Sequence, residues 1–380
     1  MSTKLGSVLA VAALSISTAM ADVPNVAVDI APVHSLVARV MQGVGTPDLI
    51  IRSGASPHHY SLRPSEAKAL QDANVVIWMG EGLTPWMEDA VATLSSEALT
   101  MSLLKKEETA LLEFRESALF EEHNHDDHND DKHEKHGHDE HDDHSDDKHE
   151  KHGHDEHDDH NDDKHEKHGH DEHDDHSDDN HEKHGHDEHE DHSAKDHAET
   201  EEHGHDEHAH GTYDPHAWLS PENAKIWLNL IAAQLSTADP ENAGTYFTNA
   251  AIALTETDTL MTEVSAMLEP IRGTRFIVFH DAYQYFETVF DFPASGAISL
   301  GDATDPSPAR ITKIQDRIKD QGVQCVLAEP QFKKGLVATV LEGTDAKTSI
   351  IDPLGIALEP GPTLYPQLIR NMAKTLVDCF

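Results

Sequence analysis

Short, uniformly apolar runs alternate with helix-like stretches along most of the chain. The runs lie at 26–30, 49–51, 75–79, 276–279, 325–328 and 349–351. A strand that is buried on both faces is apolar throughout, and strands separated by helices pair in parallel. The pattern therefore predicts an α/β fold with mostly parallel sheets that are flanked by helices on both faces.

Helix boundaries are marked by residues suited to those positions. Ser220 before Pro221 gives an N-cap and a proline in the first turn, and Ser307 before Pro308 repeats the arrangement. Gly322 suits the end of the second of these helices, because glycine readily adopts the left-handed conformation found there. These signals support the division into strands and helices.

One predicted helix is unusually long. Residues 241–268 contain no proline beyond their start, and their apolar positions recur at helical spacing. A helix of this length spans about 40 Å and would connect two α/β lobes rigidly. We therefore expect a first lobe at 22–240, a linking helix at 241–270 and a second lobe at 271–380. The alternative is two ordinary helices with an unrecognised break.

The charge of the chain is concentrated in one segment. The whole chain of 380 residues carries a formal −44, of which residues 121–210 contribute −30 through 38 acidic residues and 8 lysines. Nucleic acid and anionic membranes require clustered positive charge, so we expect neither as a partner. Small cations are the partners that this balance favours.

The same segment is a repeat that is rich in histidine. It holds 28 of the 33 histidines, in units of 16 residues with almost no apolar side chain. Such a sequence cannot bury a core, so 121–210 is predicted to be a disordered metal-binding loop inserted in the first lobe. The alternative is a solvated spacer without a role in metal binding.

The first 21 residues have the pattern of a secretory signal peptide. Lys4 precedes the mostly apolar stretch 8–13, and Ala19-Met20-Ala21 forms a cleavage motif. No later apolar run approaches the ~20 residues needed to span a bilayer, so we expect a soluble, exported protein. In an oxidising compartment, the two cysteines Cys325 and Cys379 are a plausible disulfide, although their spacing does not show that they meet.

Few histidines remain outside the repeat, and they are His34, His58, His59, His216 and His280. His58 follows the apolar run 49–51, His280 follows 276–279, and Asp352 follows 349–351. In open α/β sheets, ligands bind beyond the carboxyl ends of strands. His216 lies just before the helix that begins at Pro221. Imidazole and carboxylate are ligands that zinc accepts in a tetrahedral site.

A single histidine at a strand end is more often a hydrogen-bonding residue than a ligand. Four candidates placed alike, in a chain with a His/Asp/Glu-rich repeat, favour a metal site over four separate structural roles. His34 falls in a helical apolar pattern and is expected to be structural. His58 and His59 are neighbours whose side chains should point apart, so at most one should face the site easily.

Several motifs resemble one known family. They are GASPHHYSLRPSEAKAL (54–70), DPHAWLSPENAK (214–225), FHDAYQYFE (279–287), AEPQF (328–332) and DPLG (352–355). In sequence and order they are similar to the zinc-binding proteins of bacterial ABC importers, the ZnuA type. The resemblance extends over nearly all of 23–380 apart from the repeat.

This resemblance implies two α/β lobes joined by a long helix, with a metal ion between them. It implies His58, His216 and His280 as ligands and Asp352 as an acid at or near the fourth position, with the choice between His58 and His59 slightly open. It also implies a disulfide between the two cysteines. Manganese-binding relatives tend to carry a carboxylate where His280 stands, so Zn²⁺ is the expected ion.

Three functions compete. The first is periplasmic zinc capture by a monomer that delivers the ion to the membrane permease of an ABC importer, with no reaction catalysed. The second is a secreted metal buffer acting through 121–210. The third is a zinc-dependent hydrolase, which the absence of an H-E-x-x-H motif disfavours.

Overall fold

The computed structural model describes residues 23–115, 117, 120, 212–299, 301, 306–331 and 334–380. The predicted signal peptide and the His-rich segment 121–210 lie outside these residues. All described residues belong to one compact unit. Within the described ranges, no helix is long and apolar enough to cross a membrane.

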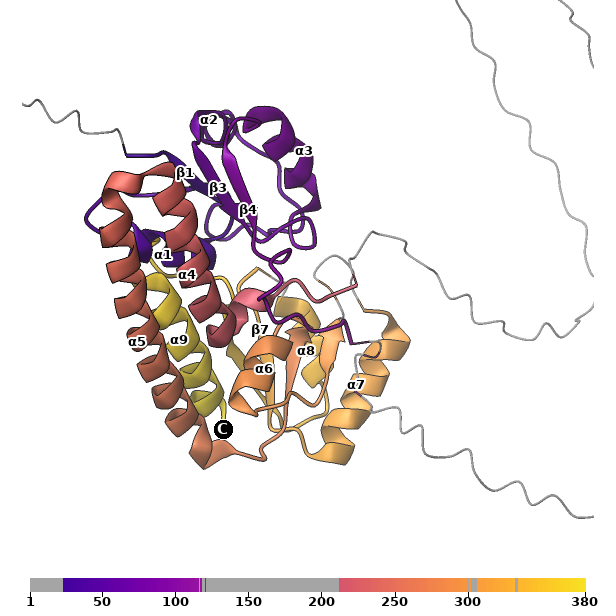
Figure 1. Ribbon diagram of the computed structural model, residues 1–380. Coiled ribbons are helices and arrows are strands. Elements are labelled where there is room, and N and C mark those ends of the chain that lie inside the picture. Colours follow the sequence, from indigo (N-terminus) through magenta and orange to yellow (C-terminus); the bar gives the residue numbers. More distant parts are fainter. Residues whose placement is uncertain are drawn as a thin grey trace, which may run out of the picture. The chain divides into compact units, whose positions relative to one another are not determined.

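Two four-stranded parallel sheets form the framework (Figure 1). The first has the order β2 (Asp48–Leu49), β1 (Val26–Val28), β3 (Val75–Trp78) and β4 (Leu99–Ser102). The second has the order β6 (Ala297–Ser299), β5 (Phe276–His280), β7 (Cys325–Ala328) and β8 (Lys347–Ile350). The two orders are equivalent, so the second sheet repeats the topology of the first. The α/β prediction with parallel sheets is confirmed.

Helices connect the strands. They are α1 (Ala31–Val40), α2 (Pro64–Asp72), α3 (Pro85–Leu94), α4 (Pro221–Ala238), α5 (Ala243–Leu268), α6 (Gln284–Phe290), α7 (Pro308–Gln321), α8 (Lys334–Leu341) and α9 (Leu364–Cys379). Short 3₁₀ turns lie at η1 (Ala217–Leu219), η2 (Pro240–Asn242) and η3 (Glu269–Ile271). The hydroxyls of Ser220 and Ser307 accept backbone N–H bonds at the starts of α4 and α7, as their N-cap assignment predicts.

The central strands of the first sheet, β1 and β3, are buried on both faces. In β3, Val75 and Ile77 contribute to a large central core, whereas Val76 and Trp78 face a separate cluster formed with α2 and α3. Successive side chains of a strand point to opposite faces, so a strand that is buried on both sides must be apolar throughout. This is why the run 75–79 lacks alternation.

The second sheet uses the same arrangement and shares the central core. In β5, Phe276 and Val278 belong to that core, whereas Ile277 and Phe279 pack in an outer cluster with α7 and α8. Residues of α1, α4, α5 and α9 also belong to the central core. One layer of helices therefore packs against the inner faces of both sheets.

Helix α5 is continuous over 26 residues, from Ala243 to Leu268. It packs against α1, α4 and α9, beside which it runs in Figure 1. The long helix is therefore as predicted, and the alternative of two helices separated by a break does not occur. The long helix is thus a component of the central core in addition to being a connection between the sheets.

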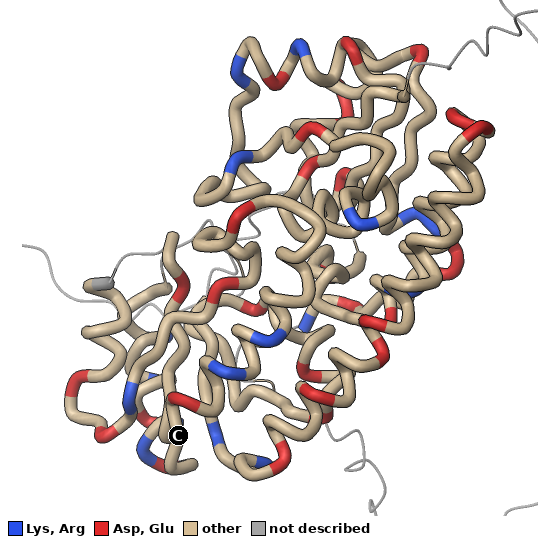
Figure 2. The backbone as a smooth tube through the Cα atoms, turned by 90° about the vertical axis from the view of Figure 1, so that its left-hand side faces the viewer, with Lys and Arg blue, Asp and Glu red and all other residues tan. Residues whose placement is uncertain are grey.

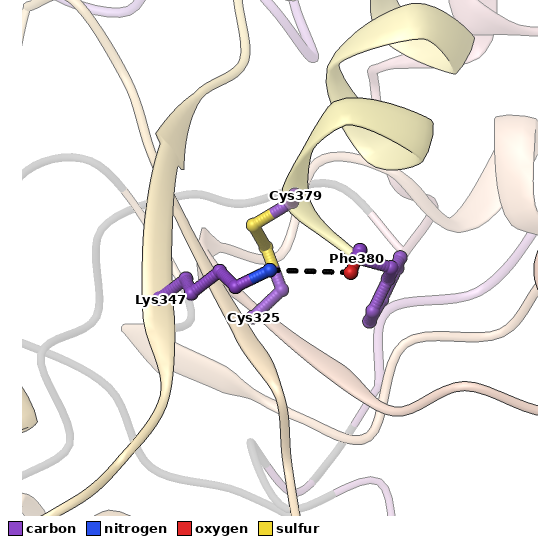
Figure 3. The surroundings of a disulfide bond; sticks show 4 residues. All are labelled: Cys325, Lys347, Cys379 and Phe380. Atoms are coloured by element: carbon purple, nitrogen blue, oxygen red, sulfur yellow. Dashed lines mark hydrogen bonds between the residues drawn. A yellow bond between two sulfur atoms is a disulfide. The ribbon is translucent and has the colours of Figure 1, made fainter.

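The C-terminal helix is tied to the rest of the molecule by a disulfide (Figure 3). Cys379 at the end of α9 is bonded to Cys325 at the start of β7, and both are buried. Nearby, the Lys347 ammonium donates to the carbonyl oxygen of Phe380 at 3.2 Å. The expected pairing of the two cysteines is confirmed.

Acidic and basic residues are interspersed along the described backbone (Figure 2). Most of the net charge of the chain belongs to 121–210, outside this part.

Loss of the disulfide should destabilise the fold measurably. The bond closes a segment of 54 residues, and chain-entropy arguments give about 4 kcal/mol as an upper expectation for such a loop. We expect the double variant Cys325→Ala/Cys379→Ala to lose about 2–4 kcal/mol of unfolding free energy in urea titrations. Reductant should lower the midpoint of the wild type and leave that of the double variant unchanged. Equal midpoints for the variant and the oxidised wild type would contradict a stabilising role.

Candidate metal centre

Three histidines from separate segments meet beyond the strand ends. His58 lies in the loop between β2 and α2, His216 immediately precedes η1, and His280 is the last residue of β5. The ring centroids of His58 and His216 are 5.5 Å apart, and those of His216 and His280 are 5.3 Å apart. The structure thus brings together the three histidines that the sequence singled out.

A buried carboxylate orients His216. The Asp214 carboxylate accepts hydrogen bonds from the backbone N–H of His216 at 2.9 Å and from its ring Nδ1 at 2.6 Å, both through Oδ1. An ionised carboxylate only accepts, so Nδ1 carries the proton and Nε2 is left with its lone pair. Outer carboxylates that fix the tautomer of ligating histidines are typical of metal sites.

His280 has the same kind of partner. Its Nδ1 lies 2.5 Å from Oε1 of Glu329, and both side chains are buried. Val278 of β5 pairs with Leu327 of β7, so the parallel register places Glu329 beside His280. The Gln331 amide donates to the other carboxylate oxygen at 2.7 Å. With Nδ1 bonded to Glu329, Nε2 is the atom through which His280 would coordinate a metal ion.

The ring separations match those of ligands around one ion. Two imidazoles bound at about 2 Å to a tetrahedral zinc have ring centres about 5 Å apart. Nevertheless, among the residues that the structure describes, no group of three or more His, Cys, Asp or Glu side chains already encloses a metal position. The rings are neighbours at ligand-like separations, and bringing three nitrogens to one ion requires local side-chain rotation.

The other two histidines lie differently. His59 is exposed, whereas His58 is half-buried and has its ring beside that of His216. Pro57, which precedes His58, accepts a hydrogen bond from the indole of Trp86 at 2.8 Å, which fixes the loop. His34 is buried, and its Nε2 lies 3.0 Å from the carbonyl oxygen of Pro47. That contact agrees with the structural role expected for His34.

The Asp352 carboxylate is hydrogen-bonded within its own loop. Its carboxylate accepts backbone N–H bonds from Leu354, Gly355 and Ala357 at 3.1, 2.9 and 3.4 Å. The next residue, Pro353, accepts a hydrogen bond from the indole of Trp218, whose ring centroid is 5.2 Å from that of His216. Asp352 therefore stabilises its own loop beside the histidine cluster.

Further buried acids surround the histidines. Burial raises the pKa of Asp281, which follows His280, to about 7, while the nearby Arg115 guanidinium acts in the opposite direction. Burial also raises the pKa of Glu287, and Arg115 opposes this shift too. The phenol of Tyr283 is buried, and burial together with the charges of Glu329 and Asp352 raises its pKa. The region is rich in buried acidic groups, and a bound cation would favour their ionised forms.

Sequence reasoning did not assign roles to Asp214 and Glu329. Glu329 directly follows the apolar run 325–328, so its place at a strand end was a usable signal. Asp214 lies in a turn before a 3₁₀ helix and bonds to His216, two residues later. No strand end or apolar run marks this position in the sequence. The structure identifies both acids through their hydrogen bonds to His216 and His280.

Comparisons with known proteins agree with this architecture. The family model described as "Zinc-uptake complex component A periplasmic" matches residues 26–379. The high-affinity zinc uptake system protein ZnuA of Brucella abortus is 42% identical over 93% of this chain and 91% of its own length. The protein of the same name from Paracoccus denitrificans is 40% identical over 95% and 93%.

A crystal structure of ZnuA superimposes with a TM-score of 0.62 and 16% identity, covering 94% of this chain and 99% of that one. At this identity the likeness establishes the fold. Two parallel four-stranded sheets with helices on their faces are the architecture that the two structures share. The chain belongs to the ZnuA family of periplasmic zinc-uptake components, which is a family of transport proteins.

Proposed function

We propose that this protein captures Zn²⁺ through His58, His216 and His280 and delivers it to the membrane permease of an ABC importer. The observation that supports this proposal best is the meeting of three imidazoles, two of which have Nδ1 bonded to a buried carboxylate. This arrangement exposes Nε2 atoms to a bound ion and requires no catalytic group. The family to which the chain belongs agrees with zinc as the transported ion.

Zinc is favoured by the donor set. Three imidazoles suit Zn²⁺, whereas Mn²⁺ prefers a set rich in oxygen. The carboxylates of Asp214 and Glu329 are outer partners, so their charge attracts a dication without replacing the nitrogen donors.

The fourth position is assigned to Asp352 as part of the proposal. Its carboxylate accepts backbone bonds in the 352–357 loop, and the indole of Trp218 connects that loop to the histidine cluster. To reach an ion, the carboxylate would exchange some of these backbone bonds for the metal. A water molecule in the fourth position is the alternative.

We further propose that residues 1–21 are a cleaved signal peptide and that the lobes span 22–240 and 271–380, joined through 241–270. The segment 121–210 then acts as a set of weak zinc sites beside the central one. An unperturbed histidine has a pKa near 6.5 and is mostly neutral near pH 7, the form that ligates a metal ion.

Deleting residues 121–210 should leave the tight zinc site intact. Titration of the full chain with Zn²⁺ should show one tight site and several weak ones, whereas the deletion variant should show only the tight one. The reason is that His58, His216 and His280 lie outside the deleted segment. If the tight site disappeared with the segment, the histidine assignment would be wrong.

Replacing a proposed ligand should abolish tight binding. We expect His216→Ala or His280→Ala to reduce zinc affinity by more than the about 10–100-fold that loss of an outer-shell partner costs. The matched control is His34→Ala, which removes a buried histidine that bonds to Pro47. Competition with a chelating dye measures the affinities. Wild-type affinity in the His280→Ala variant would exclude this residue as a ligand.

Removing an outer carboxylate should have a smaller effect. Glu329→Gln preserves the size of the side chain but replaces the charged acceptor of His280, so zinc affinity should fall about 10–100-fold. Glu342→Gln, an exposed position in the same half of the molecule, serves as control. The same competition assay applies, and equal affinities for the two variants would argue against an orienting role for Glu329.

A further inference from the structure

The two segments that flank 121–211 are hydrogen-bonded to each other and contact residues of the second half of the molecule. Glu113 and Tyr213 form an antiparallel bridge, and the backbone N–H of Asp214 donates to the carbonyl oxygen of Leu112 at 2.8 Å. We call residues 112–115 and 212–214 the root ribbon. The ribbon precedes His216 directly, so its position influences that of the histidine.

Two side chains dock the root ribbon onto β5 and α6. The Tyr285 hydroxyl accepts from the backbone N–H of Leu112 at 3.0 Å and donates to the carbonyl oxygen of Asp214 at 2.7 Å. Arg115 contacts Asp281 at 3.1 Å through Nη1 and Glu287 at 2.6 Å through Nη2. The ribbon is therefore held at both of its strands.

The Arg115 contact is well protected. The side chain of Arg115 is 19% exposed, and those of Asp281 and Glu287 are each 4% exposed. Its guanidinium also lies over the ring of Phe120, 3.9 Å from the centroid. Buried ion pairs with bidentate character fix geometry more strongly than exposed pairs, because breaking one leaves a buried charge without its partner.

We propose that Arg115 is a positioning residue for the metal centre. It holds the root ribbon, which carries Asp214 and leads to His216, against Asp281, which follows His280. Both histidines are thereby kept at a fixed separation. This inference rests on the zinc function proposed above, and it adds a residue from outside the ligand set and its carboxylate partners.

Loss of the Arg115 guanidinium has two effects on zinc affinity, one through charge and one through position, and they differ in sign. Removing the cation beside Asp281 takes away a positive charge that repels a dication, so on charge alone zinc binding would stay the same or become tighter. Loosening the ribbon would weaken binding, since the two histidines would lose their fixed separation. A lower affinity in an Arg115 variant therefore indicates positioning rather than charge.

The test compares Arg115→Met with Arg39→Met in the full chain. Arg39 makes a comparable two-pronged contact with Glu256, between α1 and α5. We expect Arg115→Met to weaken zinc binding about 10-fold or more, by analogy with other outer contacts of metal sites. The loss should appear as faster zinc release in stopped-flow measurements, and the visible absorption of bound Co²⁺ should change. Arg39→Met should leave the release rate and the Co²⁺ spectrum as in the wild type.

Arg115→Lys retains the charge but cannot place two nitrogens in the fork geometry of a guanidinium. We expect its zinc release rate to lie between those of the wild type and Arg115→Met. If Arg115→Met does not fold, Tyr285→Phe tests the same docking by removing only the hydroxyl that joins Leu112 and Asp214. We expect Tyr285→Phe also to release zinc faster.

Unchanged or tighter zinc binding in the Arg115 variant, with the wild-type Co²⁺ spectrum, would overturn the proposal. For Tyr285→Phe, the overturning result is an unchanged release rate. Failure of the zinc function itself gives a different result, because the wild type would then lack the tight site in the same titration.

Discussion

The burial of two sheets against one layer of helices is the constraint on which the rest of the structure depends. The inner faces of both sheets and the helices α1, α4, α5 and α9 form a single apolar core. Tyr365 of α9 reinforces it through two hydrogen bonds, since its hydroxyl donates to the carbonyl oxygen of Trp218 and its backbone N–H donates to the hydroxyl oxygen of Ser35. Because this core is continuous, the strand ends of both sheets are held in fixed positions. Three histidines from distant parts of the chain are therefore brought to one place.

The strand ends that this core holds in place carry buried polar groups, and these groups need partners of their own. A buried carboxylate is costly unless it is paired or hydrogen-bonded. Asp214 and Glu329 are bonded to imidazoles, Asp281 and Glu287 to Arg115, and Asp352 to backbone N–H groups. Each acid thus has a partner, yet the described acids of this region outnumber the arginine that pairs with them. A dication offsets part of the surplus, which favours divalent ions over monovalent ones at this place.

Most strands and the three clustered histidines could be predicted from the sequence. Some strands could not, for physical reasons that differ between them. Strands buried on both faces are apolar throughout, so the sequence predicts β3. Strand β4 is partly exposed, with Leu99 at 40%, and its mixed sequence does not predict a strand. The short strand β6 was missed because three residues carry little periodicity. His280 was recognisable because it ends a strand.

The carboxylate partners of the histidines were harder to predict, because they depend on contacts rather than on pattern. The pairing of Glu329 with His280 depends on the register of β5 and β7, which no local signal specifies. The docking of Arg115 joins residues more than 160 positions apart in sequence. A motif can indicate which residue types are present at a site, while the partner of each is decided by tertiary packing.

The shared core also limits how an ion can enter and leave. Rotation of one sheet against the other would break the apolar contacts of four helices at once, so large hinge motion is disfavoured. Exchange then depends on local movement of the segments that carry the ligands. His216 and His280 are buried and bonded to buried carboxylates, whereas His58 is half-buried on a loop between β2 and α2. Loops move more readily than the elements that they connect. In the proposed zinc site, the side formed by His58 is therefore where the coordination sphere should open first, and the pair formed by His216 and His280 is where the ion should be held longest.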